Sequence, residues 1–86
     1  MKADKDFILS EMGDEYVLTC TDAKKFSGMI RLNQSGAFLF RQLSDEITFD
    51  ELLDRACGEY DAERSVIEKD MMEFLSDLRA AGVINE

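Results

Sequence analysis

The stretch of sequence that decides the fold is GMIRLNQSGAFLF, residues 28–40. Its first five residues alternate in character along a short strand. Ile30 and Leu32 share one face of that strand, while Met29 and Arg31 share the other. The pattern predicts a strand over residues 28–32 with one face directed at a core.

The second part of the stretch has helical character. Asn33 is a residue type that commonly precedes the first turn of a helix, and an apolar run follows it. Gly36 lowers helix propensity by about 1 kcal/mol relative to alanine, so it indicates a place where another part of the chain packs closely. The apolar positions of the expected helix are Ala37, Phe38, Leu39, Phe40 and Leu43.

Upstream of this stretch the chain predicts a hairpin. Phe7–Leu9 opens one strand, and Gly13 with Asp14 provides a turn. Residues 16–20 then form an aromatic and β-branched run of strand length. With residues 28–32, the first third of the chain therefore predicts three strands.

Downstream, a second helix begins where Thr48 and Glu51 have the spacing of a capping box. Gly58 is expected to end this helix. Its buried side is expected to consist of Phe49, Leu52, Leu53 and Ala56.

The third and longest helix is expected to begin near Asp61 or Ser65, where Ser65 and Glu68 repeat the capping-box spacing, and to run to Ala81. Gly82 suits the position just after a helix, and residues 83–84 are expected to close the fold as an apolar segment. Five residues lie within an arc of roughly 100° and form the expected core stripe, namely Ile67, Met71, Phe74, Leu75 and Leu78.

Length and composition place these elements in one domain. A chain of 86 residues suits a single core, and we expect one domain over residues 1–86. Hydrophobic residues make up 45% and charged residues 34%, which is typical of a folded globular domain. No apolar run is long enough to span a bilayer and the N-terminus lacks a signal-peptide pattern, so we expect a cytoplasmic protein with no membrane role. The element order predicts an α+β fold in which a three-stranded antiparallel sheet is followed by three helices.

Several kinds of chemistry are excluded or disfavoured. The chain has no histidine, and on this composition we exclude both a zinc site and a histidine-based catalytic set. Cys20 and Cys57 lie far apart, and we interpret them as small buried hydrophobes rather than as a disulfide or redox pair. Carboxylates are abundant, but they fit solvated helix faces better than an acid/base pair in a cleft. No Asp-Ser-Leu sequence marks an acyl carrier. We therefore expect no enzyme activity and no cofactor.

The charge is concentrated in one half of the chain. Residues 1–43 hold six acids and six bases, so the whole formal charge of −9 lies in residues 44–86. The third helix alone carries five acids against three bases between residues 62 and 81. A surface of this sign repels phosphate backbones. A DNA-binding winged helix is nevertheless the rival hypothesis, and a retardation assay separates it from the alternatives.

Two places suit a binding site. The outer strands of a three-stranded sheet have unpaired backbone groups, so Arg31 either guards the edge at residues 28–32 or marks where an extended peptide adds as a further strand. On the third helix, Met72 lies outside the core stripe, as either a half-buried edge residue or an adaptable partner contact. We expect any groove on the Met72 flank, which also carries Glu68, Ser76 and Arg79. The opposite flank, with Glu63, Asp70 and Asp77, is interpreted as a solvated acidic face.

Residues 28–40 resemble the central motif of the PqqD-like family, the RiPP recognition elements, in which a strand ends in Leu-Asn and small residues begin the first helix. Residues 48–52 resemble its helix-loop-helix step, residues 59–61 its second loop, and residues 74–84 its closing segment. The four similarities occur in the family's order over nearly the whole chain. The basic pair in the loop before the third strand, Lys24 and Lys25, has no counterpart in the motif.

The resemblance implies a winged helix-turn-helix-like fold that binds the leader segment of a precursor peptide and performs no chemistry. It implies that the leader adds as a strand to Met29, Ile30, Arg31 and Leu32. It also implies that the leader lies beside the third helix, whose expected contacts are Glu68, Met72, Ser76 and Arg79. The implied partner enzyme is a radical-SAM maturase or a leader peptidase, with no nucleic acid involved.

Overall fold

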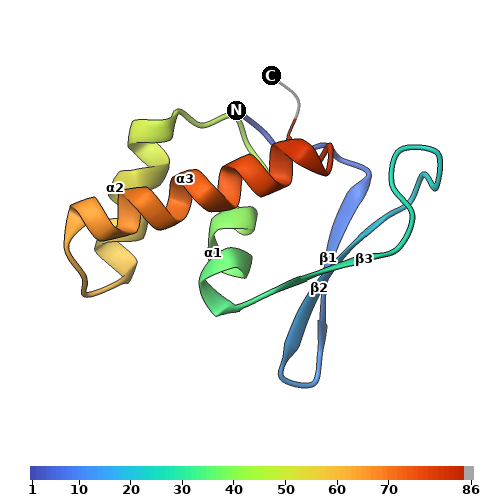
Figure 1. Ribbon diagram of the computed structural model, residues 1–86, viewed down its shortest axis with the longest axis horizontal. Coiled ribbons are helices and arrows are strands. Elements are labelled where there is room, and N and C mark those ends of the chain that lie inside the picture. The colour runs from blue at the N-terminus through green and yellow to red at the C-terminus, as the bar shows by residue number, and fades with distance from the viewer. Residues whose placement is uncertain (85–86) are drawn as a thin grey trace.

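A hairpin opens the fold. Strand β1 spans Phe7–Met12 and strand β2 spans Glu15–Cys20, so both strands are longer than the sequence predicted. Gly13 adopts a φ of +63° in the two-residue turn between them, a conformation that glycine takes at little cost. The structure, a computed structural model, describes residues 1–84 (Figure 1).

Strand β3 spans Met29–Leu32 and completes an antiparallel sheet in the order β1-β2-β3. Leu18 of β2 lies opposite Ile30, and Tyr16 lies opposite Leu32. Because side chains alternate along a strand, this register places Ile30 and Leu32 on the inner face and Met29 and Arg31 on the outer face, as predicted.

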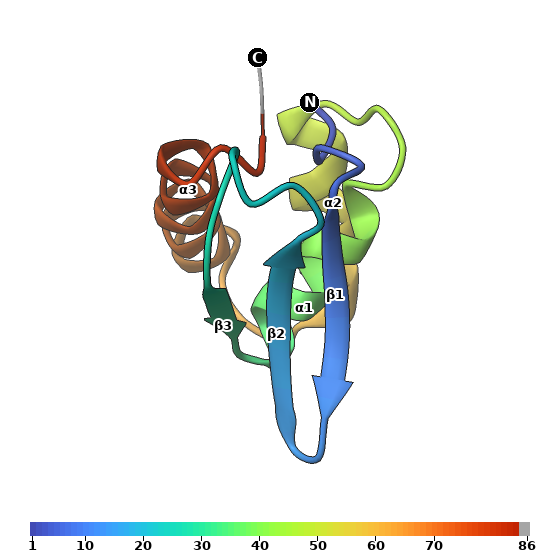
Figure 2. The same cartoon turned by 90° about the vertical axis from the view of Figure 1, so that its right-hand side faces the viewer.

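Three helices follow the sheet. Helix α1 spans Gln34–Gln42, helix α2 spans Phe49–Glu59 and helix α3 spans Arg64–Ala80. Figure 2 shows α1 and α2 behind the strands and α3 on the β3 side of the sheet. The predicted α+β order, a three-stranded antiparallel sheet followed by three helices, is confirmed.

One core joins the two layers. On α3 the stripe residues Met71, Leu75 and Leu78 are fully buried, whereas Ile67 and Phe74 are only partly buried. The largest fully buried side chains from the rest of the chain are Leu18, Leu43, Leu52, Leu53 and Val83.

The first two predicted helix starts are confirmed. Asn33 Oδ1 accepts a hydrogen bond from the Gly36 N–H at 2.8 Å. At the start of α2 the Thr48 hydroxyl accepts from the Glu51 N–H, and the Glu51 carboxylate accepts from the Thr48 N–H, each at 3.1 Å. These bonds satisfy N–H groups that have no partner within the helix itself.

The end of α2 and the capping of α3 differ from the prediction, although α3 does begin near Ser65 as predicted. Gly58 does not end α2, because the chain remains helical to Glu59 and the Tyr60 N–H still bonds to the Ala56 carbonyl. Helix α3 begins at Arg64, and the Glu63 carbonyl already accepts helical hydrogen bonds. Ser65 therefore lies inside the first turn, and its predicted capping box with Glu68 is not formed.

The end of α3 was predicted correctly. Gly82 has a φ of +80°, and the Val83 N–H bonds to the Leu78 carbonyl at 2.8 Å, which closes the helix in a Schellman motif. Val83 and Ile84 are buried, and Ile84 forms an isolated bridge with Ala3. This segment ties the N-terminal region to the helices.

Candidate functional site: a sheet edge and the pocket beside it

The outer edge of β3 is open in the part of the chain that the structure describes. Strand β3 pairs with β2 alone, and no other strand or bridge among residues 1–84 lies against it. In an antiparallel ladder every second residue directs its N–H and C=O away from its partner strand. The edge thus offers backbone donors and acceptors to an extended chain.

Arg31 does not close this edge. Its register partner is Val17, and its guanidinium lies 4.0 Å from the Glu15 carboxylate, with both side chains mostly exposed. Such a long, solvated pair stabilises little. Arg31 makes no other ion pair or side-chain hydrogen bond with a described residue. Arg31 therefore leaves the backbone groups of this edge uncovered, and its role as a charged guard of the edge stays a prediction.

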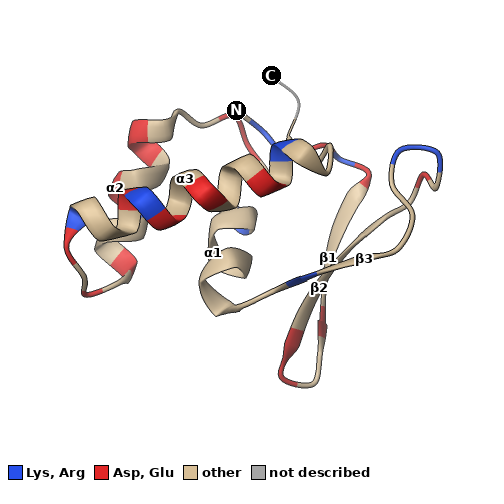
Figure 3. Cartoon of the chain, in the orientation of Figure 1, with Lys and Arg blue, Asp and Glu red and all other residues tan. Residues whose placement is uncertain are grey.

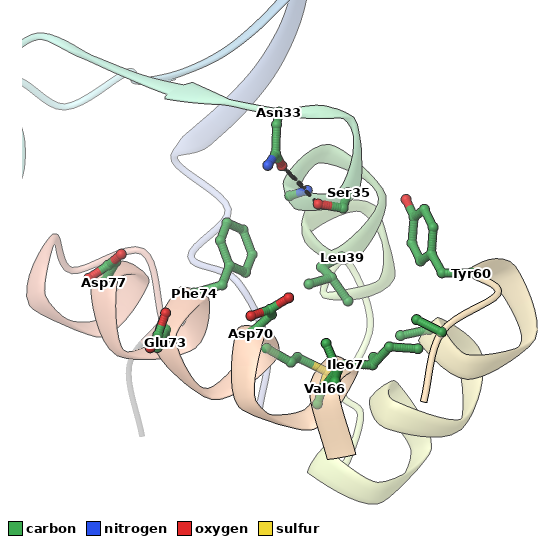
Figure 4. Close-up of a pocket in the computed structure, with 14 residues that line it drawn as sticks. Asn33, Ser35, Leu39, Tyr60, Val66, Ile67, Asp70, Glu73, Phe74 and Asp77 are labelled. Carbon is green, nitrogen blue, oxygen red and sulfur yellow. Dashed lines mark hydrogen bonds between the residues drawn. The ribbon is translucent and has the colours of Figure 1, made fainter. Parts of the chain in front are cut away.

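A pocket of about 450 Å³ begins where β3 ends. Asn33, the first residue after β3, lies at one end of it, and the start of α1 forms one wall (Figure 4). One flank of α3 forms the facing wall, with Asp70, Phe74 and Asp77. Tyr60, just after α2, lines the far end. The pocket therefore lies between α3 and the junction of β3 with α1.

Close packing at Gly36 shapes this pocket. A Cβ atom at Gly36 would lie 3.1 Å from Phe74 Cε1 and 3.2 Å from Asn33 Oδ1. The missing side chain thus lets the Phe74 ring approach the first turn of α1. The close packing that the sequence predicted for Gly36 is confirmed, and Phe74 is its partner.

An aromatic contact positions Tyr60 at the far end. Its ring meets Phe38 of α1 edge-on, with the ring centroids 5.7 Å apart. Burial, and then the neighbouring Glu59 carboxylate, raise the pKa of the Tyr60 phenol. Tyr60 is therefore held as a neutral hydrogen-bonding group beside an apolar wall.

The Met72 flank of α3 lies in a different place from the one expected. Glu68, Met72, Ser76 and Arg79 do come together, but they share their hollow with Phe49 at the start of α2. No residue of β3 lines that hollow. The expectation that this flank faces β3 is not met, because the acidic flank shares the pocket with Asn33 instead. Peptide contact at these four residues stays a prediction.

Sequence reasoning missed the role of the acidic flank. Asp70 and Asp77 are exposed and Phe74 packs partly buried against the core, as predicted, but the sequence did not show that all three also line the pocket. The sequence did hold a signal for this pocket, because Phe74 lies at the border of the core stripe and Gly36 indicated close packing. The sequence could not show that Phe74 is the residue that packs against Gly36, since this depends on the tertiary structure.

An ion cluster fixes the loop before β3. The Lys25 ammonium lies 2.6 Å from the Asp6 carboxylate and 3.1 Å from that of Asp4. Hydrogen bonds to Asp6 and then to Asp4 raise the pKa of Lys25. Lys25 thus links the β2–β3 loop to the segment before β1, which is a structural role for one residue of the unexplained basic pair.

Two further searches covered residues 1–84. No helix there is both long enough and apolar enough to cross a membrane. No three Asp, Glu, Cys or His side chains there form a group that could hold a metal ion.

Comparison with known proteins assigns the family. A family model described as coenzyme PQQ synthesis protein D (PqqD) matches residues 8–84. Two solved structures are similar, "TbiB1 in complex with the TbiA(beta) leader peptide" and "lasso peptide synthetase B1 complexed with the leader peptide". The first has a TM-score of 0.78 at 24% identity, over 96% of this chain and 93% of that one. The second has a TM-score of 0.77 at 18% identity, over 99% and 96%. No curated protein matches the chain. The match over residues 8–84 shows that the chain belongs to the PqqD family.

Proposed function

We propose that this chain is a non-catalytic adaptor that binds the leader segment of a ribosomally made precursor peptide and presents it to a modifying enzyme. The leader binds as an extra strand on β3, through the backbone of Met29, Ile30, Arg31 and Leu32. The whole chain, residues 1–86, acts as one cytoplasmic domain.

The open edge of β3 carries this proposal. Its outward N–H and C=O groups have no partner strand among residues 1–84. Strand addition uses such groups for affinity and uses neighbouring pockets to select side chains. Here an edge and a pocket adjoin at Asn33.

The comparisons support the same function. Both similar solved structures hold a leader peptide. They share the whole arrangement of strands and helices with this chain, and the PqqD family match covers the same elements. The partner enzyme that we propose is a radical-SAM maturase or a leader peptidase.

The predicted contacts on α3 form a separate part of the proposal. A leader paired with β3 reaches Glu68, Met72, Ser76 and Arg79 only if it also crosses α3, because these residues lie on the flank that faces Phe49. Met72 is 57% exposed, so a partner can reach it. Met72→Glu tests this contact apart from the β3 edge.

The test uses the short reading frames beside the gene for this chain. Each encoded peptide is titrated into the isotopically labelled protein, and the amide signals are followed by NMR. The binding peptide is expected to shift the amides of residues 28–32 together with those around the pocket. Its mass should not change, because the proposed adaptor does no chemistry. Shifts confined to other elements would refute the site.

Backbone methylation of the bound peptide tests strand addition itself. N-methyl groups at every second residue, on the side that faces β3, remove the donors of the new ladder and should weaken binding strongly. N-methyl groups on the alternate residues give the matched control, because their N–H groups point away from β3. Equal effects of the two sets would contradict strand addition.

A further inference from the structure

We propose that the pocket beside the end of β3 selects leader segments in which a basic side chain stands next to an apolar one. The inference rests on the proposed leader-binding function and names the class of sequence that the site takes. The apolar side chain enters the pocket, and the lysine or arginine pairs with Asp70 and Asp77 on α3.

The interior of the pocket favours an apolar side chain. Leu39 and Met71 are buried in its floor, and Phe74 presents a partly exposed ring. A volume of about 450 Å³ lies within the roughly 300–1,000 Å³ range of ligand pockets. This is enough for a large side chain and part of the backbone that carries it.

The α3 side of the pocket is acidic. Asp70, Glu73 and Asp77 line it, and no lysine or arginine does. None of these three carboxylates makes an ion pair or a side-chain hydrogen bond with another residue of the described chain. Asp70 and Asp77 lie two turns apart, about 10 Å along the same side of the helix. Acidic segments recur along α3 in Figure 3.

The geometry brings the leader to these carboxylates. A strand paired with the outer edge of β3 that continues past Leu32 passes Asn33, where the pocket begins. Opposite Asn33 it meets the unpaired acids of α3 (Figure 4). A basic residue gains Coulomb energy there, whereas an acidic residue meets like charge. The pocket thus discriminates by charge as well as by shape.

The test selects binders from a display library of random peptides of roughly twelve residues, about 40 Å when extended. Such a peptide can cover both β3 and the pocket. Selected peptides are expected to be enriched in Lys or Arg beside Leu, Ile, Phe or Tyr. One binder and its Lys→Gln partner are then measured against the native chain and the Asp70→Asn/Asp77→Asn variant.

Lys→Gln in the peptide should weaken binding to the native chain by about two- to five-fold, as for exposed ion pairs. The same change should cost almost nothing with the Asp70→Asn/Asp77→Asn variant. Glu11→Gln/Asp45→Asn is the matched control. It removes two exposed carboxylates that do not line the pocket, and it should keep the full lysine effect. Thermal unfolding checks that all variants are folded.

The outcomes separate this inference from the function on which it rests. Binders that shift the amides of residues 29–32 without basic enrichment, or with an equal lysine effect in both chains, overturn the charge selection and leave strand addition standing. Binders that shift no β3 amide overturn the proposed function as well. A selection that yields no binder contradicts both.

Discussion

Because Gly36 has no side chain, the Phe74 ring can pack against the first turn of α1, and this contact shapes the pocket. Alanine favours a helix by about 1 kcal/mol over glycine, but its Cβ would lie 3.1 Å from Phe74 Cε1 and 3.2 Å from Asn33 Oδ1. We expect Gly36→Ala to change the free energy of unfolding by less than about 1 kcal/mol, because the two effects oppose each other.

The same substitution should move the Phe74 ring into the pocket and weaken peptide binding. Ring proton shifts of Phe74 and peptide affinity are the measurements. Gly58→Ala is the control, since a Cβ there meets nothing within 4 Å, and it should stabilise the chain without changing affinity. An unmoved Phe74 ring in Gly36→Ala would contradict the account of the pocket.

Glu51 links the capping of α2 to pH. Hydrogen bonds from the Thr48 backbone, and then from its side chain, lower the pKa of Glu51 below its ordinary value of 4.5. A carboxylate with a lowered pKa in the folded state stabilises the fold above its unfolded pKa. That contribution is lost as the pH falls from about 4.5 through the folded pKa.

Glu51→Gln should therefore flatten the dependence of unfolding free energy on acid. Glutamine keeps the reach of the capping box but does not titrate in this range. Denaturant unfolding at several pH values between neutral and about 3 measures the difference. Glu59→Gln, whose carboxylate makes no hydrogen bond or ion pair with another residue of the described chain, should keep the native acid dependence. An unchanged profile in Glu51→Gln would refute the assignment.

At the scale of single residues, contacts between near neighbours in the sequence could be predicted, whereas contacts that depend on other parts of the chain could not. The Asn33 cap and the box of Thr48 and Glu51 were predictable, because each depends on atoms within three residues. Ser65 has the same local pattern as Thr48 but makes no cap. The helical hydrogen bonds of α3 begin at the Glu63 carbonyl, two residues before Ser65. Ser65 therefore lies inside the helix rather than at its cap position.

At the scale of an element, β3 has one face that packs on the core and one exposed face, which the proposed leader would adjoin. Ile30 and Leu32 face the core and are partly buried, whereas Met29 is 60% exposed and the Arg31 side chain is 73% exposed. Replacing Ile30 or Leu32 by alanine should cost roughly 1–3 kcal/mol, less than the 2–5 kcal/mol typical of fully buried sites.

Arg31→Glu should instead leave the unfolding free energy within about 0.5 kcal/mol and weaken leader binding. The new carboxylate would stand beside the edge where the leader is to pair. Chemical unfolding and titration calorimetry measure the two effects separately. Met72→Glu is the companion variant on α3, and it too should leave stability unchanged. Arg31→Glu with native affinity would argue against binding at this edge.

The strands and helices could be predicted because the spacing of apolar residues changes where the chain passes from strand to helix. Alternation over residues 28–32 ends at Asn33, and β3 ends one residue earlier, at Leu32. Gly58 misled the prediction for a physical reason. Glycine permits a helix to end but does not require it, and α2 continues while its backbone bonds are still made.

For the whole molecule, the sequence predicted the open edge of β3 but not which residues of α3 line the neighbouring pocket. Both flanks of α3 border the same core stripe, so periodicity alone cannot tell which one faces the sheet. The packing of Phe74 against Gly36 decides this, and it turns Asp70 and Asp77 toward the pocket. The element order was therefore predictable, whereas the rotation of α3 about its axis was not.

The charge distribution makes a prediction for the whole chain. Residues 44–86 hold thirteen acids and four bases, whereas residues 1–43 are balanced. Duplex DNA should therefore not be retarded at moderate salt, and a modifying enzyme with a basic patch should meet the helical half first. Its association rate should fall as salt rises while dissociation changes little, because screening acts mainly on the approach of the partners.

Stopped-flow mixing with the maturase or leader peptidase encoded beside the gene measures these rates. Asp45→Asn/Glu59→Gln removes two exposed acids from the helical half, and Glu11→Gln/Asp14→Asn removes two from the hairpin. The two variants change the net charge equally, so a difference between them reports where the enzyme approaches. The first should slow association more than the second. Equal slowing would show that the net charge, and not its position, controls association. Association rates that do not change with salt would contradict electrostatic steering.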